Sequence, residues 1–152
     1  MWSLKGEQPK VSTPGGRQQQ PIIGAVDPLL GRIHMGLSEH LKAEQFKQFL
    51  VYLVRFYATM DKIVHVVDNA RVHHAKLVQD FLQERGHKIE LVFLPAYSPE
   101  LNPMECVWKY LRKKVTHNTF FKTFKEFLRS LITFFRKFKN PSQEIKTLCR
   151  IF

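Results

Sequence analysis

The chain has 152 residues, 44% of them hydrophobic, which is enough for one domain with an apolar core and too little for two. Its 24 lysines and arginines against 13 aspartates and glutamates give a net charge of +11, and this excess either serves solubility alone or indicates a polyanionic partner such as nucleic acid. Cys106 and Cys149 have no metal-ligand spacing, no secretory signal pattern precedes them, and no apolar run is long enough for a membrane span, so we expect a cytoplasmic protein, associated with the nucleoid if bacterial, and no membrane partner.

The first half of the chain reads as an irregular segment followed by a hairpin, a helix and a strand. Residues 1–19 are rich in Pro, Gly and Gln, which predicts irregular structure. Two apolar runs within residues 20–37 flank a short loop at 27–31, and this pattern predicts a β-hairpin. Residues 41–57 have apolar side chains at helical spacing, and residues 63–67 are a β-branched run typical of a strand buried on both faces.

A helix over residues 73–85 and a second buried strand over 88–94 follow, with Gly86 as the expected C′ stop of the helix. Strand, helix and strand make a βαβ unit, which requires parallel strands and a right-handed crossover. Ligands of such sheets bind beyond the carboxyl ends of the strands. Asp68 lies at that end, where chemistry is expected.

A Pro-rich loop then leads to Asn102, an expected helix N-cap with Pro103 in the first helical position and Glu105 in the first turn. A last helix over about 120–138 carries a stripe of apolar residues, which indicates a packing face more than a base-stacking platform. The stripe consists of Phe120, Phe124, Phe127, Leu131, Phe134 or Phe135, and Phe138.

Asp68 and Glu105 are the candidate catalytic and metal-binding residues, because hard divalent cations need oxygen ligands that converge from rigid elements. Each also has a structural alternative. Asp68 can simply end a strand, and the spacing of Asn102 and Glu105 fits a capping box, in which the carboxylate binds the N-cap amide. His73 and His74 either contact phosphate or the metal site, or only open a helix.

Two stretches carry a family resemblance: DNARVHHA at 68–75 and LPAYSPELNPMECVW at 94–108. They resemble the catalytic core of IS630/Tc1/mariner-type DDE transposases, and the likeness extends from about Trp2 through the C-terminal helices. It implies an α/β, RNase H-like fold and metal-dependent DNA strand cleavage and transfer. By position, Asp68 corresponds to the second acidic ligand and Glu105 to the third, holding Mg²⁺ or Mn²⁺, with two ions in the complete site. Glu100 matches no ligand of the family pattern and is expected at the surface.

The family's first Asp has no counterpart here. It lies on the central strand, before a segment that Trp2, Gly6 and Pro9 resemble, whereas Asp27 falls in the hairpin loop and Asp61 at the wrong end of its strand. The resemblance therefore implies an RNase H-like core over 20–117 without its first, central strand, followed by a basic, Phe-rich helical tail over 118–152. We expect a truncated or split-frame transposase with little activity alone. Its expected partners are the DNA of element ends and target, and a second copy or an upstream-frame product that supplies the first Asp.

The region from 109 to 139 holds ten lysines and arginines against one acid, Glu126. This concentration predicts salt-sensitive phosphate contacts without sequence readout, although a solvated helix face is the alternative. The candidate DNA-binding residues are Lys109, Arg112, Lys113, Lys114, Lys122 and Lys125. Besides an active transposase domain, a non-catalytic DNA-binding remnant and an unrelated RNase H-like nuclease fit parts of this pattern.

Overall fold

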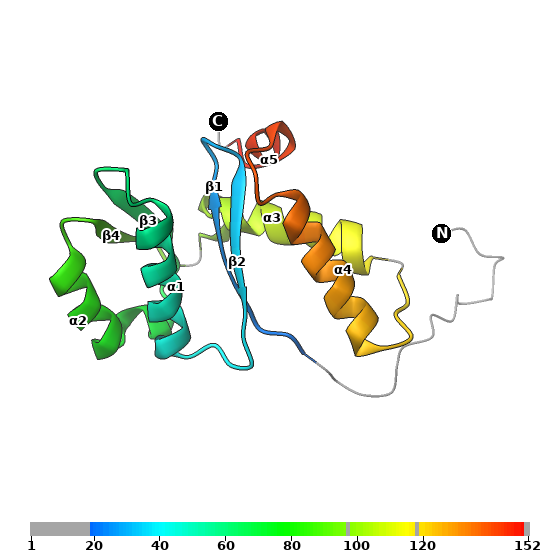
Figure 1. Cartoon of the computed structure of the whole chain (residues 1–152), viewed down its shortest axis with the longest axis horizontal. Helices are drawn as coiled ribbons and strands as arrows, with labels where there is room; N and C mark the ends of the chain where they lie inside the picture. The colour runs from blue at the N-terminus through cyan, green and yellow to red at the C-terminus, as the bar shows by residue number, and fades with distance from the viewer. Residues whose placement is uncertain (1–18, 97, 118, 151–152) are drawn as a thin grey trace.

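Two separate pairs of strands form the centre of the molecule in this computed structural model, which describes residues 19–96, 98–117 and 119–150. β1 (Ile22–Asp27) and β2 (Arg32–Leu37) are antiparallel, and β3 (Ile63–Val67) and β4 (Ile89–Phe93) are parallel. Figure 1 shows the β1–β2 hairpin between the β3–β4 unit on one side and the C-terminal helices on the other. No ladder joins the two pairs in the part of the chain that is described.

The hairpin forms because its loop satisfies its own backbone. The carboxylate Oδ1 of Asp27 accepts hydrogen bonds from the amides of Leu29 (3.0 Å) and Leu30 (2.9 Å). Gly31 closes the turn with φ +68°, a left-handed conformation that glycine adopts without a Cβ penalty. The predicted hairpin with its loop at 27–31 is therefore confirmed.

Helix α1 (Ala43–Phe56) packs against both strand pairs, and its bounds agree with the predicted 41–57 within two residues. Phe49 and Leu53 contact Ala25 of β1, whereas Phe46 and Leu50 share a buried cluster with Val67 of β3. One amphipathic helix thus covers a face of each strand pair and packs the two pairs against a common element.

The parallel βαβ unit is confirmed, with one change at the start of its helix. A 3-10 turn spans Arg71–His74, Ala75 is extended (φ −62°, ψ 143°), and α2 (Lys76–Arg85) begins only after this break. The expected single helix from residue 73 was wrong because the chain first bends back toward the end of β3. The helix ends at Arg85, directly before Gly86, as predicted, and Gly86 itself is right-handed (φ −60°).

The strands of this unit are covered on one face only, which corrects the expectation of burial on both. Val67 and Ile89 are buried against α1 and α2, but Val64 and Val66 are 58% and 42% exposed. Successive side chains of a strand point to opposite faces, and no element of the described part of the chain covers the second face. A run of apolar residues thus did not mean a strand enclosed on both sides.

The C-terminal half builds the largest core cluster on the other face of the hairpin. It consists of α3 (Pro103–Leu111), a π-helical turn (Arg112–Thr116), α4 (Phe124–Lys137) and the short α5 (Gln143–Leu148). Buried side chains from these elements surround Ile33 of β2. Among the described helices, none combines the length and the apolar character that crossing a membrane requires.

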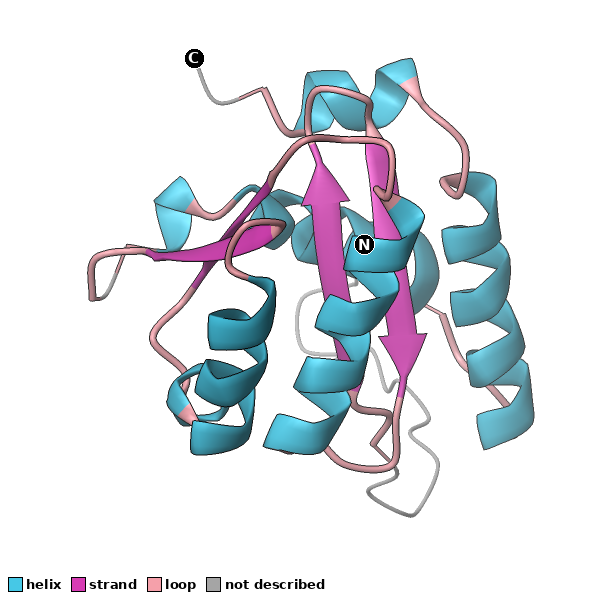
Figure 2. Ribbon diagram, turned by 60° about the vertical axis from the view of Figure 1, so that its left-hand side comes forward, coloured by secondary structure: helices cyan, strands magenta, loops and turns pink. Residues whose placement is uncertain are grey.

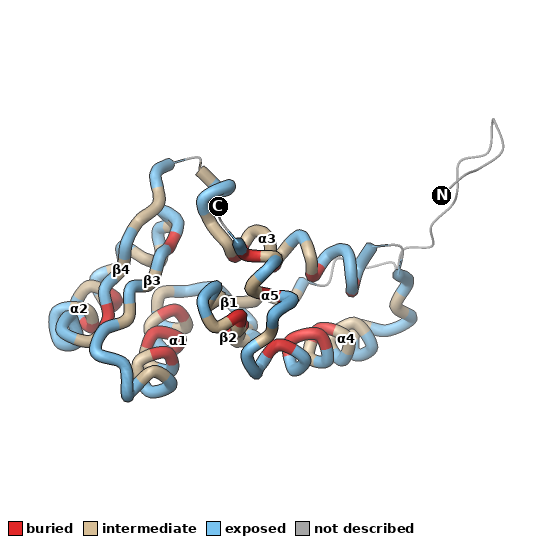
Figure 3. The backbone as a smooth tube through the Cα atoms, turned by 90° about the horizontal axis from the view of Figure 1, so that it is seen from above, coloured by how far each residue is buried: buried red, intermediate tan, exposed pale blue. Residues whose placement is uncertain are grey.

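The Phe stripe of α4 is a packing face, as predicted, but the helix begins later than residue 120. Thr123 is the N-cap and its Oγ1 accepts a hydrogen bond from the Glu126 amide (3.2 Å), which starts the helix at Phe124. Phe120 precedes the helix and is 49% exposed, whereas Leu131 and Phe138 are almost fully buried. Figure 3 shows the buried residues of α4 along one side of the helix.

Gly24 is the point at which β1 approaches α3 most closely. A Cβ placed there would lie 2.7 Å from Met104 Cε and 3.1 Å from a ring carbon of Trp108, whereas at Gly36 nothing lies within 4 Å. We expect Gly24→Val to lower the free energy of unfolding by about 1–3 kcal/mol through overpacking, and Gly36→Val to leave it nearly unchanged. Urea titrations followed by circular dichroism measure both, and equal effects would show that β1 and α3 are not packed this closely.

A buried polar chain lies between the hairpin and α1. His34, which is 3% exposed, has Tyr52 Oη 3.0 Å from Nδ1 and Tyr57 Oη 2.8 Å from Nε2. Tyr57 donates its own proton to Asp27 Oδ2 (3.0 Å), so its oxygen is left to accept from His34 Nε2–H, and Nδ1 accepts from Tyr52. This set of hydrogen bonds is complete only when His34 is neutral. Burial, with a smaller effect from the charge of Arg32, lowers the pKa of His34 to about 4.

His34 and His65 make the free energy of unfolding depend on pH. Burial also lowers the pKa of His65 to about 4, so below pH 6.5 the unfolded chain binds protons that the folded chain does not. The stabilisation is complete above pH 6.5 and is lost as the pH falls toward 4, by about 3 kcal/mol for each histidine. Urea midpoints measured from pH 7.5 to 4.5 should fall accordingly. His34→Gln should flatten the dependence, whereas an unchanged slope would contradict the assignment; His40→Gln, at an exposed position, is the control.

Candidate active site

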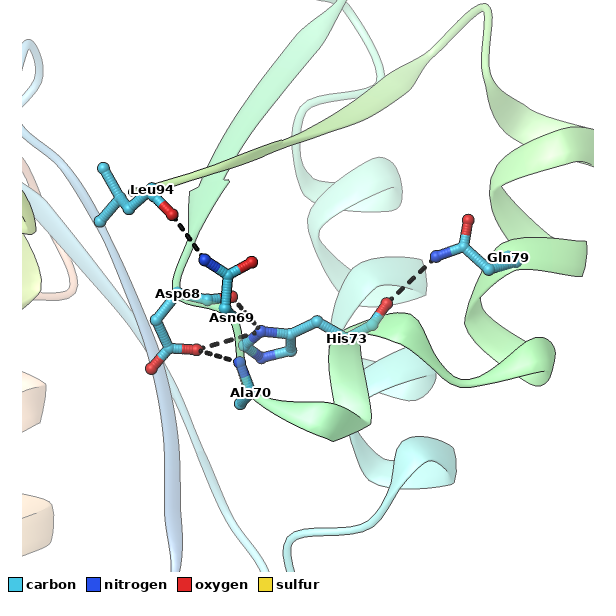
Figure 4. Close-up of polar contacts among 6 residues, drawn as sticks. All are labelled: Asp68, Asn69, Ala70, His73, Gln79 and Leu94. Atoms are coloured by element: carbon cyan, nitrogen blue, oxygen red, sulfur yellow. Dashed lines mark hydrogen bonds and ion pairs between the residues drawn. The ribbon is translucent and has the colours of Figure 1, made fainter. Parts of the chain in front are cut away.

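Asp68 follows the last residue of β3, and three contacts hold it in place. Its Oδ1 accepts a hydrogen bond from the Ala70 amide (3.1 Å) and lies 3.2 Å from His73 Nδ1. The same nitrogen lies 2.9 Å from the Asp68 carbonyl oxygen. Both oxygens are acceptors, so Nδ1 carries the hydrogen that they share. The carboxylate remains 65% exposed, which leaves its other oxygen open to a ligand (Figure 4).

The loop that carries Asp68 is attached to the neighbouring strand and helix. Asn69 donates from Nδ2 to the carbonyl of Leu94 (2.7 Å), which joins the ends of the two parallel strands, as Figure 4 shows. Gln79 of α2 donates to the His73 carbonyl (3.2 Å), and the His73 ring packs on Phe46 at 4.3 Å. His73 is therefore a partner of the candidate carboxylate, whereas the His74 ring stacks on Phe93 at 4.4 Å.

Glu105 lies in the first turn of α3, as the sequence predicts, but it does not form the capping box. Asn102 Oδ1 caps the helix by accepting from the Met104 amide (3.0 Å). The Asn102 amide, which a capping-box carboxylate would bind, donates instead to the Pro99 carbonyl (3.0 Å). Within the described ranges, the Glu105 side chain forms no hydrogen bond or ion pair. The capping-box alternative for Glu105 is thus wrong, and the carboxylate is available to a ligand.

The two carboxylates meet at one hollow although 36 residues separate them in sequence. A cavity of about 400 Å³ opens between the ends of β3 and β4 and the start of α3. Besides both acids, its lining comprises Asn69, Leu94, Pro95, Ala96, Ser98, Pro99 and Asn102. Glu100 is exposed and is not part of it, as expected. The donor set is carboxylate and amide oxygen, which suits a hard divalent cation.

Among the residues that the structure describes, no third acidic ligand lies near these two. In residues 19–96, 98–117 and 119–150, no three side chains of His, Cys, Asp or Glu lie close enough together to hold a metal. Asp27 uses both its oxygens within the hairpin and the contact with Tyr57, and Asp61 precedes β3 at the opposite end from Asp68. Neither replaces the missing ligand, in agreement with the sequence. The segment with Trp2, Gly6 and Pro9 lies outside the described residues.

The six candidate DNA-binding side chains are exposed on one continuous part of the chain. Lys109 lies on α3, and Arg112, Lys113 and Lys114 lie on the π-helical turn that extends it. Lys122 precedes α4, and Lys125 lies in its first turn. Among the described residues none of the six forms an ion pair with an acid.

The sequence did not predict that Asn69 joins the ends of β3 and β4 through its side-chain hydrogen bond. Its position directly after a strand-ending Asp is the available signal, but its acceptor, Leu94, lies 25 residues away. The contact of His73 with Asp68 was left open by the sequence and depends on the turn at Arg71–His74. Both follow from how the loop folds back on the strand ends.

Known proteins resemble this chain over most of its length. A family model described as DDE superfamily endonuclease matches residues 1–128. The chain is 29% identical over 117 residues to the insertion element IS630 uncharacterized 39 kDa protein of Shigella sonnei, covering 77% of this chain and 34% of that protein. It is 30% identical over 103 residues to the uncharacterized protein y4pE/y4sA of Sinorhizobium fredii (strain NBRC 101917 / NGR234), covering 68% of this chain and 73% of that one. The chain thus spans about a third of the length of the Shigella protein.

Solved structures of Mos1 transposase have the same fold as this chain. The Mos1 paired-end complex with left transposon end superposes with a TM-score of 0.71 at 18% identity, covering 99% of this chain and 45% of that one. The catalytic domain of Mos1 mariner transposase superposes with a TM-score of 0.63 at 19% identity, covering 86% and 66%. The fold is therefore the RNase H-like fold of that catalytic domain. From the family match over residues 1–128, this chain belongs to the DDE superfamily of endonucleases.

Proposed function

We propose that this chain is the metal-binding catalytic part of an insertion-sequence transposase that cleaves and transfers DNA strands. The observation that carries the proposal is the shared cavity, on which Asp68 and the unengaged Glu105 converge from different elements. Asp68 and Glu105 would hold divalent ions such as Mg²⁺ or Mn²⁺, two in a complete site, and bound ions would supply Lewis-acid activation of the attacking water or 3′-hydroxyl and of the leaving oxygen. His73 and the Ala70 amide orient the Asp68 carboxylate for this role.

The described residues supply two of the three carboxylates that the family's chemistry uses. Two carboxylates hold a divalent cation more weakly than three, because fewer oxygen ligands compensate for its lost hydration. We therefore infer that the isolated chain has little strand-transfer activity. We propose that an upstream-frame product supplies the third acid.

Manganese binding by the isolated chain tests the assignment of the two ligands. We expect weak, saturable Mn²⁺ binding by electron paramagnetic resonance, and a loss of affinity of more than about tenfold in Asp68→Asn and in Glu105→Gln, because each removes a charged ligand. Glu100→Gln, at an exposed position nearby, is the matched control and should bind as the unaltered chain does. Equal binding by all four proteins would contradict the site.

A plasmid-nicking assay tests the inference about activity. The isolated chain with Mg²⁺ should nick supercoiled DNA at the background rate. Robust nicking that Asp68→Ala abolishes would show that two carboxylates suffice. Sequencing the DNA upstream of the Met1 codon in all three frames adds an independent check, since an apolar run ending in Asp would identify the source of the third acid.

A non-catalytic DNA-binding remnant is the second candidate, and the six exposed basic residues favour it. In that case DNA binding should be unaffected by EDTA and by Glu105→Gln, and Mn²⁺ binding should be absent. The Mn²⁺ experiment separates the two candidates, because only the first requires the carboxylates to act together.

A further inference from the structure

The short helix α5 is attached to its neighbours at both of its ends. The Ser142 amide, directly before the helix, donates to the Gly31 carbonyl in the hairpin loop (3.0 Å). Figure 2 shows, from another side than Figure 1, that this helix lies at the loop end of the hairpin. At its other end, the thiol of Cys149 donates to the Pro103 carbonyl in the first turn of α3 (3.7 Å). The helix therefore connects the hairpin loop to the start of α3.

The second cysteine of the chain lies on the face of α3 that α5 covers. The Tyr110 hydroxyl donates to the Glu144 carboxylate, so α3 and α5 run antiparallel, with Pro103 beside the end of α5. Cys106 lies three residues after Pro103 and four before Tyr110, and residues at these spacings share one face of a helix. The side chains of Cys106 and Cys149 therefore meet at the same turn of α3.

The two thiols differ in their access to solvent. Cys149 is 1% exposed, and its burial, with a smaller contribution from the charge of a Cys106 thiolate, raises the pKa of Cys149 to about 11. Cys106 is partly exposed. Thiolates are the nucleophiles in thiol oxidation, and an oxidant in solution reaches an exposed sulfur first. The pair thus combines an accessible thiol with a protected one, which is the arrangement of an attacking and a resolving cysteine.

We propose that Cys106 and Cys149 are a site of reversible oxidation by hydroperoxides, at which they form a disulfide that joins α3 to α5. The Cys106 thiolate attacks one oxygen of the peroxide, the O–O bond breaks, and the sulfur becomes a sulfenic acid while the other oxygen leaves as hydroxide. The Cys149 sulfur then attacks the sulfenic sulfur, its proton passes to the departing hydroxyl group, and water leaves as the S–S bond forms. The two thiols lose one electron each, and hydrogen peroxide is reduced to two molecules of water.

The disulfide should stabilise the C-terminal half of the fold. It encloses all of α4 in one covalent loop, because α4 lies between the two cysteines in the chain. A cross-link that closes a long loop restricts the unfolded chain more than the folded one. The oxidised chain should therefore unfold at a higher urea concentration than the reduced chain.

Oxidation also affects the candidate active site, and this step rests on the proposed function. Cys106 directly follows Glu105, and among the described residues that line the cavity shared by Glu105 and Asp68, none belongs to α5. A bond to Cys149 draws the first turn of α3 toward α5, which lies outside this cavity. The oxidised chain should therefore bind Mn²⁺ about tenfold more weakly than the reduced chain, as when a group that orients a metal ligand is displaced.

Peptide mapping after treatment with hydrogen peroxide tests the thiol pair. Trypsin should release the peptide of residues 89–109 linked to the peptide of residues 147–150, and dithiothreitol should separate them. In Cys149→Ser, the sulfenic acid should persist on Cys106, where dimedone labels it. In Cys106→Ser, the buried Cys149 should stay unlabelled. The urea midpoint should rise on oxidation of the unaltered chain and of neither variant.

Three results would overturn the thiol pair: dimedone labels Cys106 of the unaltered chain and no linked peptide forms, the linked peptides come only from disulfide-bonded dimers, or Cys149 is labelled in Cys106→Ser as fast as Cys106 is in Cys149→Ser. Non-reducing electrophoresis separates the dimers. Equal Mn²⁺ affinity of the oxidised and reduced chains would contradict the coupling to Glu105 and leave the thiol pair intact. A reduced chain that binds no Mn²⁺ would contradict the proposed function, and the coupling with it, whereas the linked peptide would still establish the site of oxidation.

Discussion

DNA affinity of this chain should fall by about a thousandfold when the salt concentration rises from about 50 to about 200 mM, if six basic residues each contact a phosphate. Lys109, Arg112, Lys113, Lys114, Lys122 and Lys125 are exposed and unpaired with acids in the described part of the chain. Each phosphate contact releases condensed counterions, so the slope of log affinity against log salt counts the contacts at about 0.9 each. Fluorescence anisotropy with a labelled duplex at several salt concentrations measures the slope.

The double substitution Lys113→Gln and Lys114→Gln assigns this effect to the basic surface. It should lower the slope by about 1.8 and weaken binding uniformly across sequences, because phosphate contacts carry no sequence information. Lys62→Gln is the matched control, since Lys62 is paired with Glu90 at 2.6 Å on a different part of the molecule. A slope that the double substitution leaves unchanged would mean that these lysines only solvate the helix.

Phe138→Ala should lower the free energy of unfolding by about 3–5 kcal/mol, because it removes a phenyl ring from a site that cannot collapse easily. Phe138 is 1% exposed, and its ring contacts Phe134 (5.1 Å between centroids) and Tyr110 (6.2 Å). The Phe138 carbonyl also accepts from the Ile33 amide of β2 (3.1 Å), which attaches the end of α4 to the hairpin. Such a loss is a large part of the stability of an ordinary domain.

Phe120→Ala is the control for this substitution, because Phe120 is a half-exposed member of the same predicted stripe. It should cost less than about 1 kcal/mol. Urea unfolding followed by circular dichroism compares the two variants. If Phe138→Ala lowered the urea midpoint of only part of the circular dichroism signal, the C-terminal helices would form a separate unit. They would then not share a common core with β2.

The local elements could be predicted because the signals for them are local. Residues 63–67 form the predicted strand, Asn102 and Pro103 start α3 as expected, and the parallel pairing of β3 with β4 follows from the βαβ pattern. The predicted helix starts were wrong where a contact that the local sequence pattern does not show decides where the helix begins. Helix α2 starts after a turn that brings His73 to Asp68, and α4 starts at the Thr123 cap and not at Phe120.

The candidate carboxylates could also be predicted, but their availability could not. Asp68 stands out by its place at the end of an apolar run, and Glu105 by the motif residues around it. The spacing of Asn102 and Glu105 equally fits a capping box, and only the hydrogen bond from the Asn102 amide to Pro99 excludes it. The orientation of Asp68 by His73 likewise depends on the fold of the loop.

The sequence by itself determined the family, the RNase H-like fold, the two acidic residues and the absence of an Asp before residue 27, because motif residues and charges can be read without coordinates. Only the tertiary structure decided which faces and edges are covered. Val64 and Val66 have the composition of an enclosed strand but are exposed. Burial and backbone pairing depend on neighbours distant in sequence, and among the described residues β1 and β3 each have a partner strand on one side only.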